Sequence, residues 1–335
     1  MQEVWVFAEQ EDGVLSEVAL ELLSKARELA GQLAVRVGAV LAGSRVEVLA
    51  RDLIAHGADR VYLAEHERLE LYQTLPYANV VADAVRSYAP QIVLFGATVL
   101  GRDLAPRVAS ILRTGLTADC TDLQIGSHKD AATGKEYRNL LLQIRPAFGG
   151  NIIATIVTPE HRPQMATVRE GVMRLAQKDT GRSGEVVRLP VDVRAEDCPL
   201  VILERSRRPR KVDLKKARVI VSGGAGVGSR ENFQLIRDLA HALGGEVGAS
   251  RAAVDFGFIS KEHQVGQTGT TVRPKLYVAC GISGAVQHRA GMSEAGKIVA
   301  INTDPNAPIF SIAHYAIVGD LNQVIPMLIK AAKER

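Results

Sequence analysis

A chain of 335 residues with 47% hydrophobic and 23% charged residues is long enough for two globular domains, each with its own core, and too apolar to be disordered. The net charge is only +4 and the basic residues are mostly dispersed, which argues against a nucleic-acid surface. No apolar run is long enough to cross a bilayer, and the chain begins with a strand-like segment and no cleavable leader, so we expect a cytoplasmic protein.

Strand-like and helix-like segments alternate over the first 116 residues. Strands are expected at VWVFAE, LAVRVGAVL, RVYLAE and QIVLFGA, and amphipathic segments over residues 15–29, 46–56, 77–87 and 104–112. Short β runs with helices close on either side are typical of a parallel sheet covered on both faces. This part therefore predicts an α/β domain with a doubly wound sheet.

After Leu116 the pattern changes to strand-like pieces separated by turns. These pieces are LTADCTDLQI, EYRNLLLQIRP, NIIATIV, ATVR and EVVRLPVDV. Successive strands without helices between them are typical of antiparallel structure. We expect antiparallel additions to the first sheet, and a first domain of residues 1–203.

Residues 204–216 are crowded with arginine and lysine. We interpret them as a solvated linker or hinge, with a docking surface for an acidic partner as the alternative. A second βα series follows, with strands at ARVIVSGG, EVGAS, KLYVACG, KIVAIN and YAIVGD and helices over 232–243 and 321–333. Residues 217–335 therefore predict a second, Rossmann-like doubly wound domain.

The glycine-rich turn SGGAGVGS, residues 222–229, nearly fits two nucleotide motifs. The dinucleotide fingerprint would need its third glycine at Ser229. The mononucleotide phosphate loop would need Lys and Ser or Thr where Ser229 and Arg230 stand. The spacing favours a nucleotide-type ligand, and a tight turn of purely structural purpose is the alternative.

Polar residues follow each strand of the second domain, where open α/β sheets bind their ligands. Ser250 and Arg251 follow one strand, and Asn302 and Asp304 follow another. Arg251 could meet a 2′-phosphate, which keeps an NADP-dependent oxidoreductase open, although Glu246 lies at the wrong end of its strand to hold an NAD ribose. A nucleotide-binding regulatory module without redox chemistry is a further alternative.

The VGQTGTTV segment, residues 265–272, holds no strand long enough for a core. Its backbone N–H, amide and hydroxyl groups suit a loop that wraps a polar, planar or phosphorylated ligand. GISGA, residues 281–285, opens a helix whose first N–H groups suit a pyrophosphate or an electron-rich carbonyl.

The cysteines and histidines indicate no metal site. Cys120, Cys198 and Cys280 lie far apart with no C-x-x-C pair, and the eight histidines form no H-x-x-x-H or H-E-x-x-H pattern. We therefore expect three free thiols.

Longer motifs in this region resemble a known family. SRAAVDFGF, VGQTGTTVRPKLYVACGISGAVQHRAGM, VAINTDPNAPIF and IVGDL closely resemble the FAD-binding domain of the electron transfer flavoprotein alpha subunit, the family that includes the nitrogen-fixation homologue FixB. LFGAT, TGLTADCTDL and RPAFGGNIIATI in the first domain resemble the same family. The resemblance covers the whole chain, and its motifs resemble those of the bacterial and anaerobic branches more than those of the mitochondrial branch.

The resemblance implies one FAD in the second domain. In the family, the pair that matches Ser250 and Arg251 contacts FAD, and the threonine that matches Thr268 reaches the N5 region of the flavin. The residue that matches His288 lies beside the N1 and C2 carbonyl edge, and Asn302 and Asp320 match positions at the adenosine end. The implied cofactor-binding residues are Ser250, Arg251, Val265, Gly266, Gln267, Thr268, Ser283, Gly284, Ala285, Val286, Gln287, His288, Asn302, Asp320 and Leu321.

Electrostatics agrees with these positions. A flavin that has taken up one electron can carry negative charge on its N1 and O2 side, and positive groups there stabilise it. We expect Arg251, a cationic His288 and the helix end at GISGA to supply that charge. The chain departs from the family at Ala225, where arginine is usual, which puts the tuning of the flavin in doubt.

The resemblance also implies partners. The family forms a heterodimer with a beta subunit, on which the first domain packs while the second is mobile, so residues 204–216 would be a hinge. The beta subunit would hold a second FAD or AMP. The dimer would relay electrons from an acyl-CoA dehydrogenase-type flavoprotein, or bifurcate electrons from NADH to ferredoxin or flavodoxin through the beta subunit. No substrate turnover by the chain alone is expected.

Overall fold

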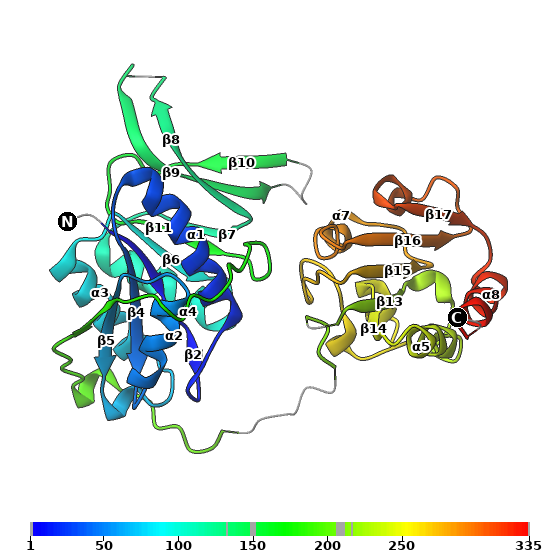
Figure 1. Ribbon diagram of the computed structural model, residues 1–335, viewed down its shortest axis with the longest axis horizontal. Helices are drawn as coiled ribbons and strands as arrows, with labels where there is room; N and C mark the ends of the chain where they lie inside the picture. Colours follow the sequence, from blue (N-terminus) through cyan, green and yellow to red (C-terminus); the bar gives the residue numbers. More distant parts are fainter. Residues whose placement is uncertain (1–2, 132, 148–151, 206–211, 216, 334–335) are drawn as a thin grey trace. The chain divides into compact units, whose positions relative to one another are not determined.

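The computed structural model describes residues 3–131, 133–147, 152–205, 212–215 and 217–333 (Figure 1). The described residues up to Arg205 form one compact unit and those from Val212 on form a second. The predicted boundaries at 1–203, 204–216 and 217–335 stay a prediction, because much of the predicted linker, at 206–211 and 216, lies outside the described residues.

A seven-stranded parallel sheet, in the order β12-β5-β4-β1-β6-β11-β7, forms the centre of the first unit. The central strands β1, β4 and β6 are buried along their whole length, which explains their continuous apolar runs. The strands are β1 Val4–Phe7, β4 Val37–Gly43, β5 Arg60–Glu65, β6 Ile92–Gly96, β7 Leu116–Cys120, β11 Gln164–Val168 and β12 Glu185–Arg188.

Helices cover both faces of this sheet. α1 (Glu17–Leu33) and α2 (Ala50–Ala55) contribute to one apolar core, and α3 (Thr74–Tyr88) and α4 (Val99–Leu112) contribute to the other. The doubly wound α/β class predicted for this part is confirmed. Short 3-10 helices, η1 Glu47–Leu49, η2 Glu67–Leu69 and η4 Ala195–Asp197, and the β2 (Gln10–Glu11) and β3 (Val14–Leu15) hairpin complete the unit.

The antiparallel strands expected after Leu116 are present, but they do not extend the first sheet. β8 (Asp122–Lys129), β9 (Glu136–Ala147) and β10 (Ile152–Ile156) form a three-stranded sheet of their own (Figure 1). The strands before and after them, β7 and β11, pair in parallel. Because parallel neighbours need a crossover connection, the separate sheet takes the place of the usual crossover helix. The predicted pairing was wrong for this reason.

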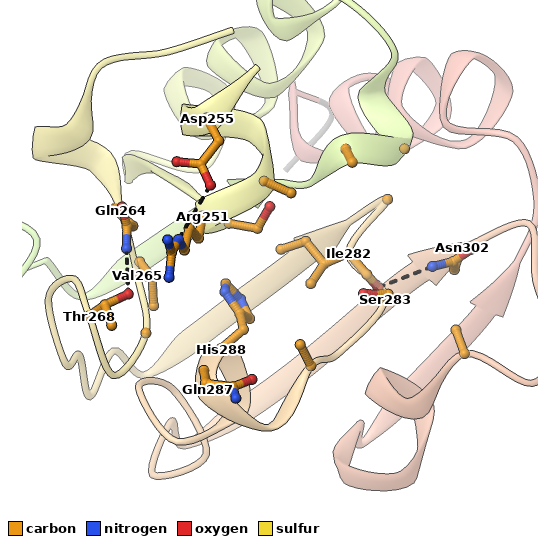
Figure 2. A pocket seen from close by; sticks show the side chains of 18 of the residues that line it. Arg251, Asp255, Gln264, Val265, Thr268, Ile282, Ser283, Gln287, His288 and Asn302 are labelled. Carbon is orange, nitrogen blue, oxygen red and sulfur yellow. Dashed lines mark hydrogen bonds and ion pairs between the residues drawn. The ribbon is translucent and has the colours of Figure 1, made fainter. Parts of the chain in front are cut away.

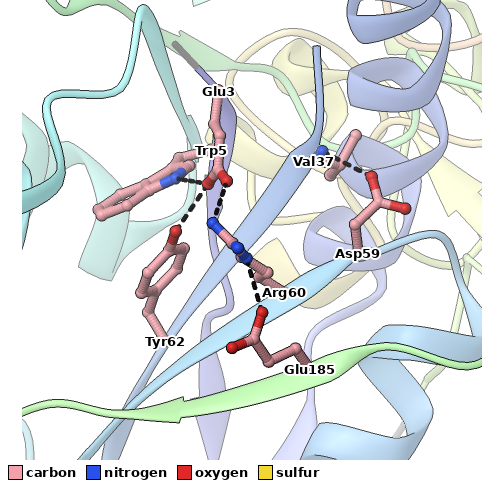
Figure 3. A network of polar contacts seen from close by, with 7 residues as sticks. All are labelled: Glu3, Trp5, Val37, Asp59, Arg60, Tyr62 and Glu185. Atoms are coloured by element: carbon pink, nitrogen blue, oxygen red, sulfur yellow. Dashed lines mark hydrogen bonds and ion pairs between the residues drawn. The ribbon is translucent and has the colours of Figure 1, made fainter. Parts of the chain in front are cut away.

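A buried carboxylate organises one end of the first sheet (Figure 3). Glu3 accepts hydrogen bonds from Trp5 Nε1 at 2.8 Å, Tyr62 Oη at 2.8 Å and Arg60 Nη1 at 3.1 Å. Arg60 Nε also donates to Glu185 of the edge strand β12 at 2.9 Å. A buried charge costs much free energy unless it is paired, so this network ties β1, β5 and β12 together as a structural element.

The second unit has a five-stranded parallel sheet in the order β14-β13-β15-β16-β17. Numbered along this unit the order is 2-1-3-4-5, which places the topological switch point between β13 and β15. The strands are β13 Val219–Gly223, β14 Glu246–Ala249, β15 Leu276–Cys280, β16 Lys297–Asn302 and β17 Tyr315–Val318. The predicted parallel α/β class is confirmed here as well.

The two faces of this sheet are covered differently. The long helices α5 (Phe233–Ala242) and α8 (Leu321–Lys333) pack together on one face. Short helices and extended segments cover the other face, around Val272, Met292 and Ile309. The short elements of this unit are η5 Ala225–Val227, α6 Arg251–Asp255, η6 Lys261–His263, α7 Val286–Arg289 and η7 Pro308–Ile312, of which η5 and α6 contribute Val227 and Ala253 to the core with α5 and α8. No helix in the described part of the chain is long and apolar enough to span a membrane.

Candidate functional site

A cavity of about 660 Å³ lies at the carboxyl edge of the second sheet (Figure 2). The segments that follow β13, β14, β15 and β16 line it, so it spans the switch point of the sheet. Its volume is in the range of cofactor and substrate pockets. The predicted residues that line it are Ser250, Arg251, Val265, Gly266, Gln267, Thr268, Ser283, Ala285, Gln287, His288 and Asn302.

Four predicted residues lie outside this lining: Gly284, Val286, Asp320 and Leu321. A Cβ at Gly284 would lie 2.3 Å from the backbone nitrogen of Ile309, so only glycine fits there. Asp320 caps α8 by accepting the backbone N–H of Asn322 at 2.8 Å, and Leu321 is buried in the core. These contacts give both residues a structural role, and their contact with a ligand stays a prediction.

Other lining residues were not assigned from the sequence. They are Ala225, Gly226, Ala252, Asp255, Gln264, Gly281, Ile282, Asp304 and Ala307. Their positions after strand ends already indicated Ala225, Gly226 and Asp304. Gln264 and Asp255 gave no such signal, because neither directly follows a strand: Gln264 lies in a loop, and Asp255 lies at the end of a short helix.

The glycine-rich turn does not form a phosphate cradle. The backbone N–H groups of Gly224 and Gly226 donate to Cys280 O at 2.8 Å and Gly281 O at 3.0 Å. Those of Val227 and Gly228 donate within the turn, at 3.2 and 3.0 Å. A Cβ at Gly224 would lie 2.1 Å from Gly281 O. The glycines therefore let two turns pack closely, while Ala225 and Gly226 line the cavity, so a nucleotide-type ligand beside this turn stays a prediction.

Free backbone donors occur instead in the segment that follows β15, the strand that pairs with β13. Among the described residues, no hydrogen bond uses the N–H groups of residues 283–287. Gly281, just before this row, and Gly284, within it, have φ of +62° and +92°. Consecutive N–H groups in such a turn make a concavity that suits an anion. The helix that follows, α7, is only four residues long, so the amides rather than a long helix dipole supply the positive potential.

Arg251 brings a cation to the cavity. Ser250 caps α6 by accepting the N–H of Ala253 at 3.3 Å, which places Arg251 in the first turn of that helix. Its Nε pairs with Asp255 at 3.3 Å, one turn later, and the side chain remains 69% exposed (Figure 2). An exposed ion pair of this kind leaves the guanidinium free to bind a ligand at low energetic cost.

The loop at 264–270 is held by backbone hydrogen bonds and contains no strand, as expected. Val265 N donates to Ala249 O at 2.9 Å, and Gln267 N donates to Gln287 O at 2.7 Å. The first contact ties the loop to the end of β14 and the second ties it to α7. The loop is thus fixed between the cation at Arg251 and the free amides.

His288 is buried beside this loop. Its Nε2 lies 3.0 Å from the hydroxyl of Tyr277, and its Nδ1 has no hydrogen-bond partner of good geometry. Burial lowers the pKa of His288 to about 4, and the backbone of Val265 opposes this shift only in part. The imidazole is therefore neutral near pH 7. In the ligand-free chain the imidazole therefore does not carry the expected positive charge, because a side chain 6% exposed loses the hydration that a cation needs, and its role at a bound flavin stays a prediction.

Comparison with known proteins identifies the family. A model described as "Electron transfer flavoprotein domain" matches residues 4–194, and one described as "Electron transfer flavoprotein FAD-binding domain" matches residues 213–293. An electron transfer flavoprotein subunit alpha from Thermoanaerobacterium thermosaccharolyticum is 53% identical over 334 residues, which cover 99% of this chain and 98% of that protein. The chain belongs to the electron transfer flavoprotein alpha-subunit family.

Other members of the family match along their whole length. A protein FixB from Clostridium saccharobutylicum is 49% identical, with 99% of this chain and 96% of that protein covered. The acryloyl-CoA reductase electron transfer subunit beta of Anaerotignum propionicum is 43% identical, with the same shares covered. Membership confirms the predicted role in electron transfer with a flavin, in place of the two alternatives left open by the sequence. Most of the cavity lies within the stretch that matches the FAD-binding model.

Proposed function

We propose that this alpha subunit binds one FAD in the cavity of its second unit and relays electrons between flavoprotein dehydrogenases and other carriers. The observation that supports this most is that one cavity combines groups that can bind a pyrophosphate with groups that can bind an electron-rich ring. A row of free amides at 283–287 suits a pyrophosphate, and Arg251 with the loop at 265–268 suits an electron-rich ring.

In this proposal each group has a defined task. The amides of Ser283, Ala285 and Gln287 would donate to the pyrophosphate, and Arg251 would stabilise negative charge on the ring. The uncharged His288 offers a hydrogen bond rather than a charge. Bound FAD supplies the capacity to accept and pass on one or two electrons. The chain orients the cofactor and sets its electrostatics.

The adenosine end is assigned to Asn302, with Asp320 as a further predicted contact. Asn302 lines the cavity, and its Nδ2 donates to Ile282 O at 3.0 Å while its Oδ1 accepts from Asp304 N at 3.0 Å. Both groups of its amide are therefore engaged in shaping the loops. We propose that Asn302 acts on the adenosine mainly by holding these loops in place.

We propose a heterodimer with a beta subunit, which holds a second FAD or AMP. The relative named as the electron transfer subunit of acryloyl-CoA reductase supports an acyl-CoA dehydrogenase-type flavoprotein as redox partner. Two modes of action remain in this proposal. A second FAD would allow bifurcation from NADH to ferredoxin or flavodoxin, and AMP would fit a simple electron shuttle.

Co-purification with the beta subunit tests the proposal. We expect a yellow complex with flavin absorption at about 370 and 450 nm. The ratio of FAD to AMP in the denatured complex then decides the mode: two FAD indicate bifurcation, and one FAD with one AMP indicates the shuttle. A correctly folded complex that stays colourless after incubation with FAD would contradict the proposed cofactor.

A further inference from the structure

Gln264 has a buried side-chain amide that contacts Thr268, a residue predicted to bind the flavin. It is 4% exposed, whereas Thr268 is exposed to the cavity, and both residues line it. The Nε2 atom of Gln264 donates to Thr268 Oγ1 at 2.9 Å (Figure 2). We propose that Gln264 is a positioning residue, which directs the proton of the Thr268 hydroxyl toward an acceptor atom of the bound flavin. This inference rests on the proposed FAD site.

The backbone of Gln264 is held on both sides. Its N–H donates to Lys261 O at 3.0 Å, and its carbonyl accepts from Thr270 N at 2.8 Å. It bridges to Ala249, the last residue of β14. A Cβ at Gly269 would lie 2.3 Å from the carbonyl of Gln264, so the loop returns closely over it. The side-chain amide therefore projects from a fixed point toward Thr268.

A hydroxyl group has one proton to donate and two lone pairs that accept. When Gln264 donates to one lone pair of Thr268, the proton of Thr268 points away from Gln264. The Thr268 proton is then available to an acceptor in the cavity. The hydrogen bond that Thr268 accepts from Gln264 strengthens the one that Thr268 donates. A carboxylate at position 264 would accept that proton instead, which would reverse the direction of the pair. The matching ligand chemistry is a ring nitrogen with a free lone pair, for which N5 of the flavin is the atom to test.

An analogue that lacks this one acceptor provides the experiment. In 5-deaza-FAD a C–H group replaces N5, and the rest of the molecule is unchanged. Dissociation constants for FAD and for 5-deaza-FAD are measured with the full chain in complex with its beta subunit. We expect Gln264→Leu and Thr268→Val each to weaken FAD about five- to tenfold, the effect of one hydrogen bond. Both should change the affinity for 5-deaza-FAD less than twofold.

Two further variants keep the test decisive. Gln264→Glu preserves shape and should weaken FAD more than Gln264→Leu, because its carboxylate takes the proton of Thr268. In a Thr268→Val background, Gln264→Leu should add no further loss, since the pair acts as a unit. Gln234→Leu, which removes an exposed amide on α5 that bonds Asp238, is the control and should leave both affinities unchanged.

The outcomes separate this inference from the proposed function. An equal loss of affinity for FAD and 5-deaza-FAD in Gln264→Leu would show that Gln264 only shapes the loop, and would overturn the inference. Failure of the unchanged complex to bind FAD would instead overturn the proposed function. A loss confined to FAD supports both.

Discussion

The charge state of His288 matters for stability as well as for the ligand. The unfolded histidine has a pKa near 6.5, whereas burial lowers the native pKa to about 4. Between these values the unfolded chain binds a proton that the native protein does not bind. The free energy of unfolding therefore decreases as the pH falls from about 6.5 to about 4, with a slope on the order of 1.4 kcal/mol per pH unit. Above about pH 6.5 this histidine makes no contribution to the pH dependence.

This gives a direct prediction. In the ligand-free chain, His288→Gln should flatten the decrease of unfolding free energy between pH 6.5 and 4.5. Urea unfolding at several pH values measures it, with His241→Gln on the exposed surface of α5 as the control. An unchanged slope in His288→Gln would show that the histidine is charged in the native protein.

Ala225 is a second position at which a single substitution should change the charge in the cavity. It is exposed and lines the cavity at the start of η5. An arginine there would bring a positive charge to the flavin in addition to Arg251. We predict that Ala225→Arg raises the potential of the first one-electron reduction, by about 59 mV for each tenfold gain in binding of the reduced over the oxidised form.

A redox titration of the complex measures this change. Ala225→Gln, which adds length without charge, is the matched control and should leave the potential close to that of the unchanged protein. A potential that stays the same or decreases in Ala225→Arg would contradict the prediction.

At the level of single residues, the sequence predicted which residues line the cavity better than it predicted their charge states and contacts. The motifs around Arg251 and Thr268 placed both residues in one cavity, because they directly follow strands or form a loop without apolar residues. The sequence could not show that His288 is neutral, since burial depends on what packs around it. Gln264 and Asp255 were missed for a related reason: their role depends on contacts four residues away, with Thr268 and Arg251.

At the level of elements, glycines decide how closely two turns approach. Gly224 packs against Gly281, the residue that follows β15. We predict that Gly224→Ala destabilises the second unit by about 1–3 kcal/mol, because its Cβ would overlap a backbone carbonyl that cannot move freely. Urea unfolding of the chain checks this value, and normal stability would show that the turns can separate without cost.

Gly31 provides the opposite case. It lies near the end of α1, and a Cβ added there meets no atom within 4 Å. Gly31→Ala should stabilise the first unit by about 0.5–1 kcal/mol, because alanine loses less backbone entropy in a helix. The same urea experiment measures it. A destabilised Gly31→Ala protein would contradict the helical environment described for this residue.

Elements themselves were well predicted where apolar periodicity was strong. The strand at RVYLAE and the helix at 321–333 coincide with β5 and α8. The direction of the strands after Leu116 could not be predicted, because β7 and β12 are only partly buried and lack the continuous apolar runs that mark buried parallel strands. Only the spatial neighbours of β7 and β11 distinguish a separate sheet from an extension of the first.

On the scale of the whole molecule, each unit has its own apolar cores. We therefore predict two thermal transitions for the ligand-free chain. Added FAD should raise the temperature of only one, that of the second unit, by a stabilisation of about 2.7 kcal/mol at a free concentration a hundred times the dissociation constant. Calorimetry with and without FAD tests this. A single transition, or an equal shift of both, would contradict the independence of the units.

The cavity has a consequence for how the family can vary. Every described residue that lines it lies between Ala225 and Ala307, so one continuous piece of the chain carries the part of the pocket that the structure describes. Insertions, deletions or exchanges in the first 205 residues leave the composition of the pocket untouched. The expected packing of the first unit on a beta subunit would therefore let partner recognition change from one organism to another without any change in the residues that line the pocket.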